Sequence, residues 1–302
     1  MRYPAFEEIN YETANELWEA LSPTKSFFKE PYKLIYRGQA DAEWGLIPSL
    51  LRNKTSNPLL KFMGRPSRAD ELVFTEVRLL EEFASYCDNV GIRIPNDSMK
   101  FRTDVLNSQV QDKYYIRPEL WPNPELVELM ALAQHHGVPT RLLDWTRQPY
   151  VAVYFAVSSA MANHKNWNLD TKLTIWVLNT ELVNLYKNVN IVQVPGSTSH
   201  HVSAQSGLFT VHPHSGYRNE EFEVEGLEHG FSSLPNSPLL KLTLSVDEAL
   251  NLYYLCLKAG INGATIYPSA DGAGKAVQDS INSWTIDKID KNRKEKEVGT
   301  QH

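Results

Sequence analysis

The stretch that decides the fold of this chain is Gln134-His135-His136-Gly137-Val138-Pro139-Thr140-Arg141-Leu142-Leu143-Asp144-Trp145-Thr146. Before it, apolar residues at helical spacing predict a helix over 125–136, and Gly137 is a suitable residue to end that helix. After it, residues 151–157 are apolar on every side and predict a buried helix. If residues 140–146 are extended, the stretch joins two helices through one strand.

An extended segment 140–146 divides its side chains between two faces. One face then carries Thr140, Leu142, Asp144 and Thr146, and the other carries Arg141, Leu143 and Trp145. The first face is mostly polar, which a strand buried in a core does not need. Thr146 is also a candidate N-cap for the following helix, and a helix N-terminus attracts anions. The alternative is that Asp144 pairs with Arg141 or Arg147 and caps that helix.

A second polar cluster, Tyr36-Arg37-Gly38-Gln39, follows the predicted strand 33–36. Glycine lets a ligand approach the backbone closely, and a guanidinium matches the planar geometry of phosphate or carboxylate. Arg37 needs a partner, because an unpaired buried charge costs several kcal/mol. That partner is either an anionic ligand or a structural carboxylate.

The remaining pattern predicts short helices and strands without strict alternation. Helices are expected at 12–21, after a capping box Ser67-Arg68-Ala69-Asp70 with Val73, Val77, Leu80 and Ala84 facing inward, and from a second capping box at Ser245–Glu248 to Gly260. Strands are expected at 173–178, 191–194, 208–211, 240–244 and 264–267. We therefore predict an α+β fold in a single domain, with a mixed or antiparallel sheet flanked by helices.

The expected domain organisation has three parts. Residues 1–30 form an N-terminal helical lead-in, residues 31–285 the α+β domain, and residues 286–302 a charged tail that frays. Within the domain, residues 92–124 carry four prolines and predict an irregular, flexible insertion.

Composition excludes several classes of protein. The 302 residues carry a net charge of −6, which argues against a protein that coats nucleic acid. The chain lacks an apolar run of about 18 residues, so we expect no membrane partner, and its acidic start predicts no secretory signal. Cys87 and Cys256 lie far apart in predicted apolar helices, which favours buried thiols and a cytoplasmic location.

Two later clusters are less informative. Four histidines lie within residues 200–214, but neither a cysteine nor an acid at suitable spacing joins them, so we predict no metal site there. Gln205, at a strand start, is a candidate for a polar ligand contact. Asp271 is a weaker candidate for a site acid, because turn chemistry alone explains Asp271-Gly272.

In this order, the clusters resemble the FRG-domain family. Tyr36-Arg37-Gly38-Gln39 is similar to the aromatic-Arg-Gly motif that names the family, and residues 134–146 are similar to its second hallmark. The runs Ala204–Phe209 and Gly260–Pro268 extend the resemblance to roughly residues 30–280. His201 departs from it, because an arginine often stands there in the family. That departure weakens any basic contact expected from this part of the chain.

The family resemblance also implies that the chain comes from a bacterial or phage-associated protein. The order of its polar clusters, strands and helices is similar to that of ADP-ribosyltransferases. On that resemblance NAD is the substrate, Arg37 holds its phosphate or ribose, and Gln205 stands at the late-strand position. The acid that stabilises the ribose cation is Asp144 or Asp271. The other residues expected to contact NAD are Tyr36, Gly38, Gln39, His136, Thr140, Arg141 and Thr146.

Three functions therefore stay open. The first is an NAD-consuming transferase or NAD glycohydrolase, acting as a toxin or anti-phage effector, with a protein or nucleic-acid acceptor and an antitoxin or regulatory partner. The second is a nuclease-like effector that uses His135, His136, Arg141 and Asp144 as acid–base groups. The third is a ligand- or partner-sensing domain without catalysis, in which Arg37 and Asp144 form a closed ion pair.

Overall fold

A computed structural model describes residues 3–25, 27, 33–52, 68–183, 186, 189–193, 205–211, 217–221, 224–233 and 235–299. Its strands form one sheet of seven, in the order β1-β7-β4-β2-β3-β6-β5. Their bounds are β1 Glu7–Tyr11, β2 Leu34–Gln39, β3 Leu142–Thr146, β4 Lys172–Asn179, β5 Asn190–Val192, β6 Gly207–Val211 and β7 Leu239–Ser245. β1 runs parallel to β7, and the other neighbours are antiparallel. The predicted α+β fold with a mixed sheet is confirmed.

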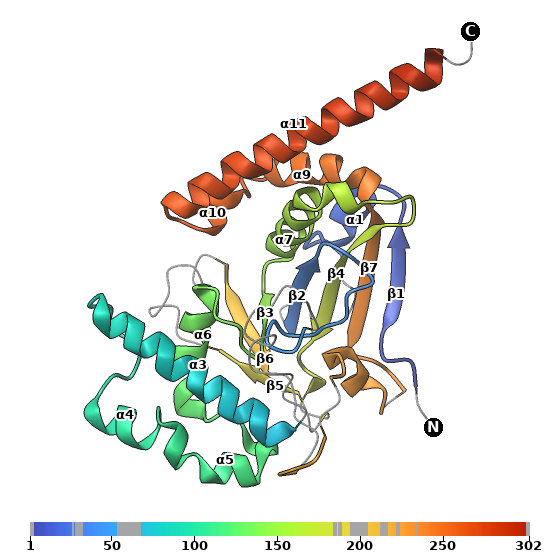
Figure 1. Ribbon diagram of the computed structural model, residues 1–302. Coiled ribbons are helices and arrows are strands. Elements are labelled where there is room, and N and C mark those ends of the chain that lie inside the picture. The colour runs from blue at the N-terminus through green and yellow to red at the C-terminus, as the bar shows by residue number, and fades with distance from the viewer. Residues whose placement is uncertain are drawn as a thin grey trace.

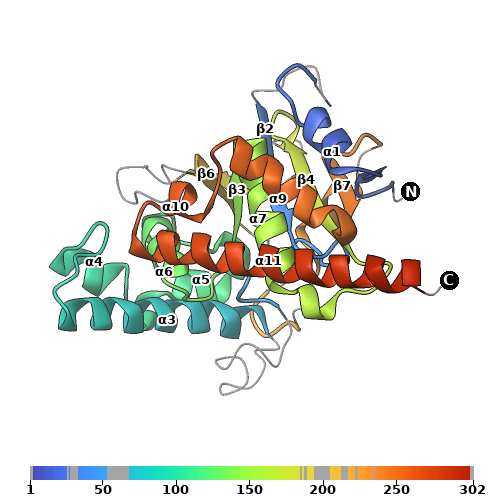
Figure 2. The ribbon, with the colours of Figure 1, turned by 90° about the horizontal axis from the view of Figure 1, so that it is seen from above.

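In the view of Figure 1, the helices gather at the top of the sheet and at its lower left, and β1 forms the edge at the right. Their bounds are α1 Ala14–Ala20, α3 Ala69–Asn89, α4 Met99–Asp104, α5 Asp112–Ile116, α6 Val127–His135, α7 Pro149–Ala162, α9 Ala249–Lys258, α10 Gly263–Ile266 and α11 Ala270–Gly299. α7 packs on the centre of the sheet and shares a core with α1 and α9. Seen from above, α11 passes across α7 and α9 (Figure 2).

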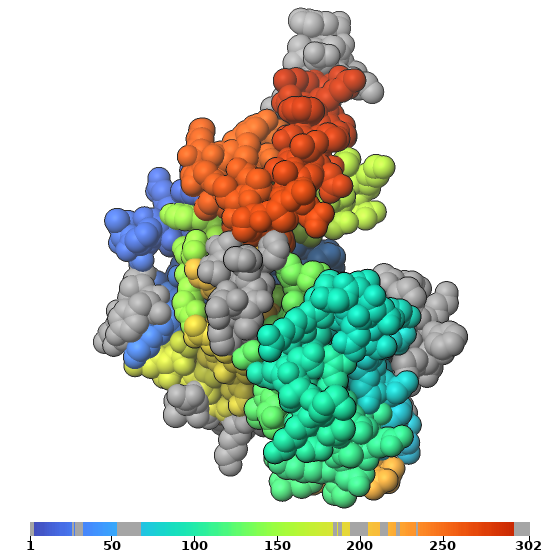
Figure 3. All heavy atoms as spheres, turned by 90° about the vertical axis from the view of Figure 1, so that its left-hand side faces the viewer, coloured from blue at the N-terminus to red at the C-terminus, as the bar shows by residue number. Residues whose placement is uncertain are grey.

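A second core joins α3, α4, α5 and α6 to the β3–β6 end of the sheet. The predicted inner face of α3 is confirmed, because Val73, Val77, Leu80 and Ala84 are all buried in this core. In the surface view, this lobe and the C-terminal helices form separate bulges (Figure 3). From this lobe α6 contacts β3, and α7 contacts both β2 and β3.

The middle of the sheet is also its weakest junction. β2 pairs with β4 over six positions, but within the described residues its register with β3 consists of one pair, Tyr36 and Thr146. Beyond that pair, β2 and β3 part. The sheet therefore holds a split between its β1-β7-β4-β2 half and its β3-β6-β5 half.

Gly38 on β2 is required by the helix above it. A Cβ atom at this position would lie 1.9 Å from the carbonyl oxygen of Ala152 and 2.7 Å from the backbone nitrogen of Ala156, both on α7. Backbone atoms of a buried helix cannot move aside cheaply. The sequence pattern predicted that a ligand approaches the backbone at Gly38. In the structure it is α7 that approaches β2 closely at this residue.

Most predicted elements are confirmed, although α7 continues five residues past Val157 to Ala162 and β2 continues three residues past Tyr36 to Gln39. These are the helices at 12–21, 125–136 and 151–157 and the strands at 33–36, 173–178, 208–211 and 240–244. Gly137 and Gly260 follow their helices with φ of +85° and +75°, the left-handed conformation that glycine adopts without strain. Cys87 and Cys256 are buried free thiols.

Several expectations at the helix ends are wrong. Residues 264–267 do not form a strand, because the side chain of Asn262 accepts hydrogen bonds from the backbone of Ala264 and Thr265 and caps α10. Thr146 ends β3, and Gln148 is the N-cap of α7. The N-cap of α3 is Arg68, whereas Ser67 lies outside the described residues.

The outer parts of the chain are more regular than expected. Residues 92–124 hold α4, α5 and three short 3-10 turns rather than irregular chain, because Phe101, Tyr114 and Trp121 are buried against α3 and α6. The predicted lead-in contributes β1, which the sequence pattern did not indicate. The charged tail continues α11 as far as Gly299.

We predict that Gly38→Ala lowers the free energy of unfolding by about 3 kcal/mol or more, because the new methyl group overpacks the β2–α7 contact. Gly274→Ala is the matched control, since a Cβ atom there meets nothing within 4 Å and the residue lies inside α11. That control should be neutral or stabilise by up to about 1 kcal/mol. Urea denaturation measures both, and equal stability of the two variants would contradict this account of Gly38.

Candidate functional site

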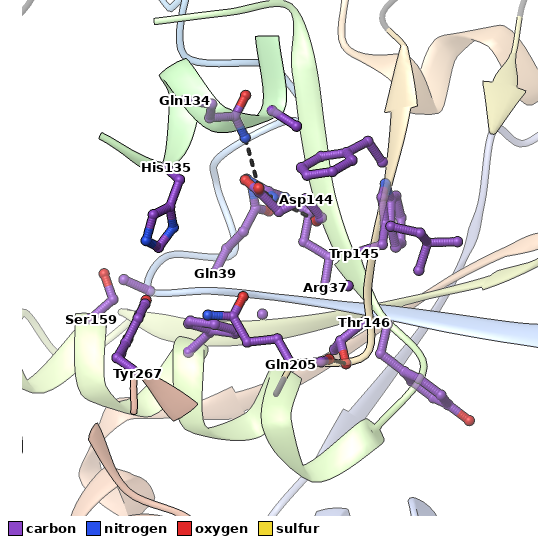
Figure 4. Close-up of a pocket in the computed structure, with 18 of the residues that line it drawn as sticks. Arg37, Gln39, Gln134, His135, Asp144, Trp145, Thr146, Ser159, Gln205 and Tyr267 are labelled. Carbon is purple, nitrogen blue, oxygen red and sulfur yellow. Dashed lines mark hydrogen bonds and ion pairs between the residues drawn. The ribbon is translucent and has the colours of Figure 1, made fainter. Parts of the chain in front are cut away.

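A pocket of about 400 Å³ opens where β2 and β3 part, and residues of α6 and of α7 contribute to its lining. Its lining comes from elements far apart in the sequence (Figure 4). The strands contribute the polar residues Arg37 and Gln39 (β2) and Asp144 and Thr146 (β3), and the helices contribute Gln134 and His135 (α6) and Ser159 (α7). The segments between elements contribute Arg52, Gln205 and Tyr267. The lining thus brings together Arg37, Asp144 and Gln205, the three residues on which the expected site depends.

Arg37 bridges the split in the sheet. Its Nη1 atom donates a hydrogen bond to the backbone carbonyl of Asp144 at 2.8 Å and lies 3.7 Å from the carboxylate of the same residue. Its Nε atom is buried and has no hydrogen-bond partner. Burial lowers the pKa of Arg37 to about 10; Asp144 opposes this shift and Arg52 reinforces it. The guanidinium therefore stays charged at neutral pH, at a cost in desolvation.

The Asp144 carboxylate is 65% exposed and is oriented by a short chain of hydrogen bonds. Gln134 donates from Nε2 to Asp144 Oδ1 at 2.7 Å, the contact drawn in Figure 4. Thr140 donates its hydroxyl hydrogen to Gln134 Oε1 and accepts from the backbone N–H of Leu142. This order of donors fixes which way the amide of Gln134 points. Thr140 thus orients Gln134, and Gln134 donates to Asp144, so the carboxylate acts as an acceptor.

A second cation, Arg52, reaches the pocket from the loop that follows β2. Its Nε atom donates to the carbonyl of Ile47 at 2.9 Å, and Ser49 and Leu50 bond to the backbone of Thr140. Desolvation lowers the pKa of Arg52, and Asp144 raises it. No sequence motif marked Arg52 as a candidate site residue. The contact with Ile47, which fixes its side chain, is visible only in the folded chain.

Gln205 lies at the entrance to β6. Its backbone carbonyl accepts a hydrogen bond from the Thr146 hydroxyl at 2.6 Å, and its amide donates to the carbonyl of Ile266 at 3.4 Å. The Thr146 hydroxyl in turn accepts from the backbone N–H of Gln148. Through these two hydrogen bonds Thr146 connects the end of β3 to the residue before β6 and to the start of α7. Thr146 is also the β3 residue that pairs with Tyr36 of β2.

Three of the residues expected to contact NAD do not line the pocket. His136 is exposed at the end of α6, with its ring 6.3 Å from that of Phe83. Thr140 is buried and acts through Gln134. Arg141 is 1% exposed and forms an ion pair with Glu76 of α3. Asp271 is exposed in the first turn of α11 and is also absent from the lining.

The pair of Arg141 and Glu76 is structural. Glu76 is 2% exposed, accepts from Arg141 Nε at 2.5 Å, and also accepts from the Trp121 indole at 2.8 Å. The interpretation that Arg141 or Arg147 pairs with Asp144 is therefore wrong, because Asp144 faces Arg37. Within one short motif, Arg141 ties α3 to β3 while Asp144 faces the pocket.

Gln39 and Tyr36 line the pocket but also serve the fold. The amide of Gln39 is occupied on both sides, since it accepts from the Trp176 indole at 2.6 Å and donates to the carbonyl of Gly45 at 3.2 Å. Burial raises the pKa of Tyr36 to about 12. Tyr267 has its pKa raised to about 12 by burial and by the charges of Asp144 and Asp279. Both phenols are thus neutral hydrogen-bonding groups.

The described residues contain no cluster of three or more histidine, cysteine or acidic side chains placed to hold a metal ion. The histidines at 200, 201, 212 and 214 lie outside those residues. Among the helices described here, none is long and apolar enough to cross a membrane.

Fold and pocket together define an α+β protein with a polar, aromatic-walled pocket at a split in its central sheet. The family model of the FRG domain matches residues 32–166, which confirms the resemblance over that segment. The match includes Arg37, Gln134 and Asp144 but ends before Gln205 and Tyr267. Searches of curated proteins and of solved structures returned no significant match.

We predict that Glu76→Gln lowers the free energy of unfolding by about 3–5 kcal/mol, because it leaves the buried charge of Arg141 without a counter-ion. Asp144→Asn should cost less than about 1 kcal/mol, because the carboxylate it removes is mostly exposed. Urea denaturation of both variants makes the comparison. If Asp144→Asn were the more damaging change, the assignment of Arg141 to structure and Asp144 to the site would be wrong.

Proposed function

We propose that the pocket binds NAD and that the protein consumes it, as an ADP-ribosyltransferase-like transferase or as an NAD glycohydrolase. The observation that carries this proposal is the convergence of Arg37, Arg52 and Asp144 on one pocket at the split between β2 and β3. Its volume of about 400 Å³ lies within the range of roughly 300–1,000 Å³ that is typical of ligand pockets.

The charges of the pocket favour an anionic ligand. Two guanidinium groups face one carboxylate in the described lining, which leaves an excess of positive charge for a phosphate group. Guanidinium groups bind phosphate through paired hydrogen bonds. A diphosphate such as that of NAD would offset part of the desolvation that lowers the pKa of both arginines.

Asp144 supplies what breaking the nicotinamide–ribose bond requires. In that step the bond between ribose C1 and the ring nitrogen breaks, its electron pair neutralises the pyridinium, and positive charge develops on the ribose. A fixed carboxylate beside the ribose stabilises that charge. Thr140 holds Gln134, and Gln134 holds the Asp144 carboxylate in place for this role.

The second half of the reaction decides the product. A nucleophile attacks C1 of the ribose and loses its proton to solvent or to a base. If the nucleophile is water, the protein is a glycohydrolase, and if it is a side chain or a nucleobase, the protein transfers ADP-ribose. Gln205 carries no charge and cannot stabilise the ribose cation as a carboxylate does. We therefore assign it the role of orienting the nucleophile or the ribose through hydrogen bonds.

The other two hypotheses have less support. A nuclease built on His135, His136, Arg141 and Asp144 would need Arg141 in the pocket, whereas its guanidinium is paired with Glu76. A sensing domain with a closed pair of Arg37 and Asp144 does not require the cavity that adjoins them. The FRG resemblance extends the proposal to a bacterial toxin or anti-phage effector in the cytoplasm, controlled by an antitoxin or a regulatory partner.

We predict that the purified protein, incubated with NAD and with or without cell lysate, releases nicotinamide, and that Asp144→Asn reduces the rate about 100-fold or more. Arg52→Gln should raise KM, because it removes a phosphate contact. Asp170→Asn and Arg78→Gln are matched controls on the surface, outside the pocket lining, and should leave the rate unchanged. Chromatography of the nicotinamide formed is the measurement.

Two results would contradict the proposal. One is that the folded wild-type protein releases no nicotinamide under either condition. The other is that Asp144→Asn turns over NAD as fast as Asp170→Asn does, because the carboxylate would then have no part in the reaction.

A further inference from the structure

One aromatic side chain that lines the pocket is exposed to solvent. The lining holds two tryptophans, of which Trp145 is 3% exposed and Trp44 is 46% exposed. The Trp145 indole donates to Thr210 and belongs to the core. Trp44 instead lines the pocket and is exposed, so its indole is available to contact a bound ring.

The loop that carries Trp44 is held on both sides. Before it, the backbone N–H of Ala42 donates to the carbonyl of Lys172 at 2.7 Å. After it, the backbone N–H of Leu46 donates to the buried carboxylate of Glu228 at 2.8 Å. Trp44 itself closes the turn by donating its N–H to the carbonyl of Asp41 at 3.2 Å. Its backbone is thus already ordered, so binding costs little conformational entropy there.

Trp44 shares the pocket with the two cations. Arg52 and Arg37 provide for an anionic group, and an exposed indole provides for a flat ring. Stacking on an aromatic side chain is worth about 1–3 kcal/mol per base and tolerates many ring types, because every base has a π face. A ligand that joins a heterocycle to a phosphate uses both features, whereas a bare anion or a sugar phosphate uses only one.

We propose that Trp44 is the ring-binding residue of this pocket and stacks on a heterocycle of its nucleotide ligand. The inference rests on the proposed function, since NAD is the ligand that the charges favour. NAD offers two such rings, adenine and nicotinamide, and both have the chemistry that Trp44 recognises. The experiment separates them, because each ring can be supplied on its own nucleotide.

Isothermal titration calorimetry of the whole chain tests the proposal with three probes. ADP-ribose carries adenine without nicotinamide, nicotinamide mononucleotide carries nicotinamide without adenine, and ribose 5-phosphate carries neither ring. The variants are Trp44→Ala, Trp44→Phe and, as the matched control, Trp284→Ala. Trp284 is 68% exposed on α11 and does not line the pocket. Thermal melting of each variant accompanies the titrations.

Trp44→Ala should weaken binding of the ring-bearing probe that stacks by about fivefold to a hundredfold, the range that follows from the free energy of stacking. Binding of ribose 5-phosphate should stay unchanged. Trp44→Phe should retain most of the affinity, and Trp284→Ala should bind like the wild type. The probe that loses affinity identifies which ring of NAD lies on Trp44.

Equal affinity of wild type and Trp44→Ala for both ring-bearing probes would overturn the role of Trp44. If Arg52→Gln still weakened binding and NAD were still consumed, the proposed function would stand without it. Wild-type affinity for ribose 5-phosphate that equals its affinity for the ring-bearing probes would also overturn the inference. Failure of the wild type to bind any of the three probes would overturn both proposals.

Discussion

The site depends on a hydrogen bond from Arg37 to the backbone carbonyl of Asp144. β2 and β3 share one register pair, Tyr36 with Thr146, and then part. A carbonyl left without its ladder partner needs another donor, and the guanidinium supplies one at 2.8 Å. The same contact keeps a cation at the floor of the pocket. The split in the sheet therefore leaves the carbonyl that holds this cation in the pocket.

Some charged residues near this split are buried and connect secondary-structure elements, and others are exposed in the pocket. Glu76 and Arg141 are both buried and connect α3 to β3, so the helical lobe stands at a defined distance from the sheet. On the C-terminal side, Tyr154 and Ser158 of α7 donate to Asp279, which is fully buried on α11. These contacts hold the walls of the pocket. Asp144 and Arg52, in contrast, keep part of their surface open to ligand.

Local sequence predicted the elements that depend on periodicity and on single residues. The helices 125–136 and 151–157 followed from apolar spacing, and Gly137 ended the first of them as expected. The prediction of a strand at 264–267 failed because a single side chain decides the local structure: Asn262 caps a short helix at these residues. It also missed β1, a short and mostly polar edge strand whose partner β7 lies more than 200 residues away.

The sequence by itself determined the α+β class, the succession of a strand with polar residues and a buried helix, and the choice of Arg37 and Asp144 as candidates, both of which line the pocket. These properties are written in composition and short-range spacing. Only the tertiary structure decided that Arg141 belongs to Glu76 and Arg37 to Asp144, and that Arg52, Gln134 and Trp44 join the pocket. The sequence does not distinguish an arginine that forms a structural ion pair from one that lines a pocket. The difference lies in burial, and burial depends on segments that are distant in the sequence.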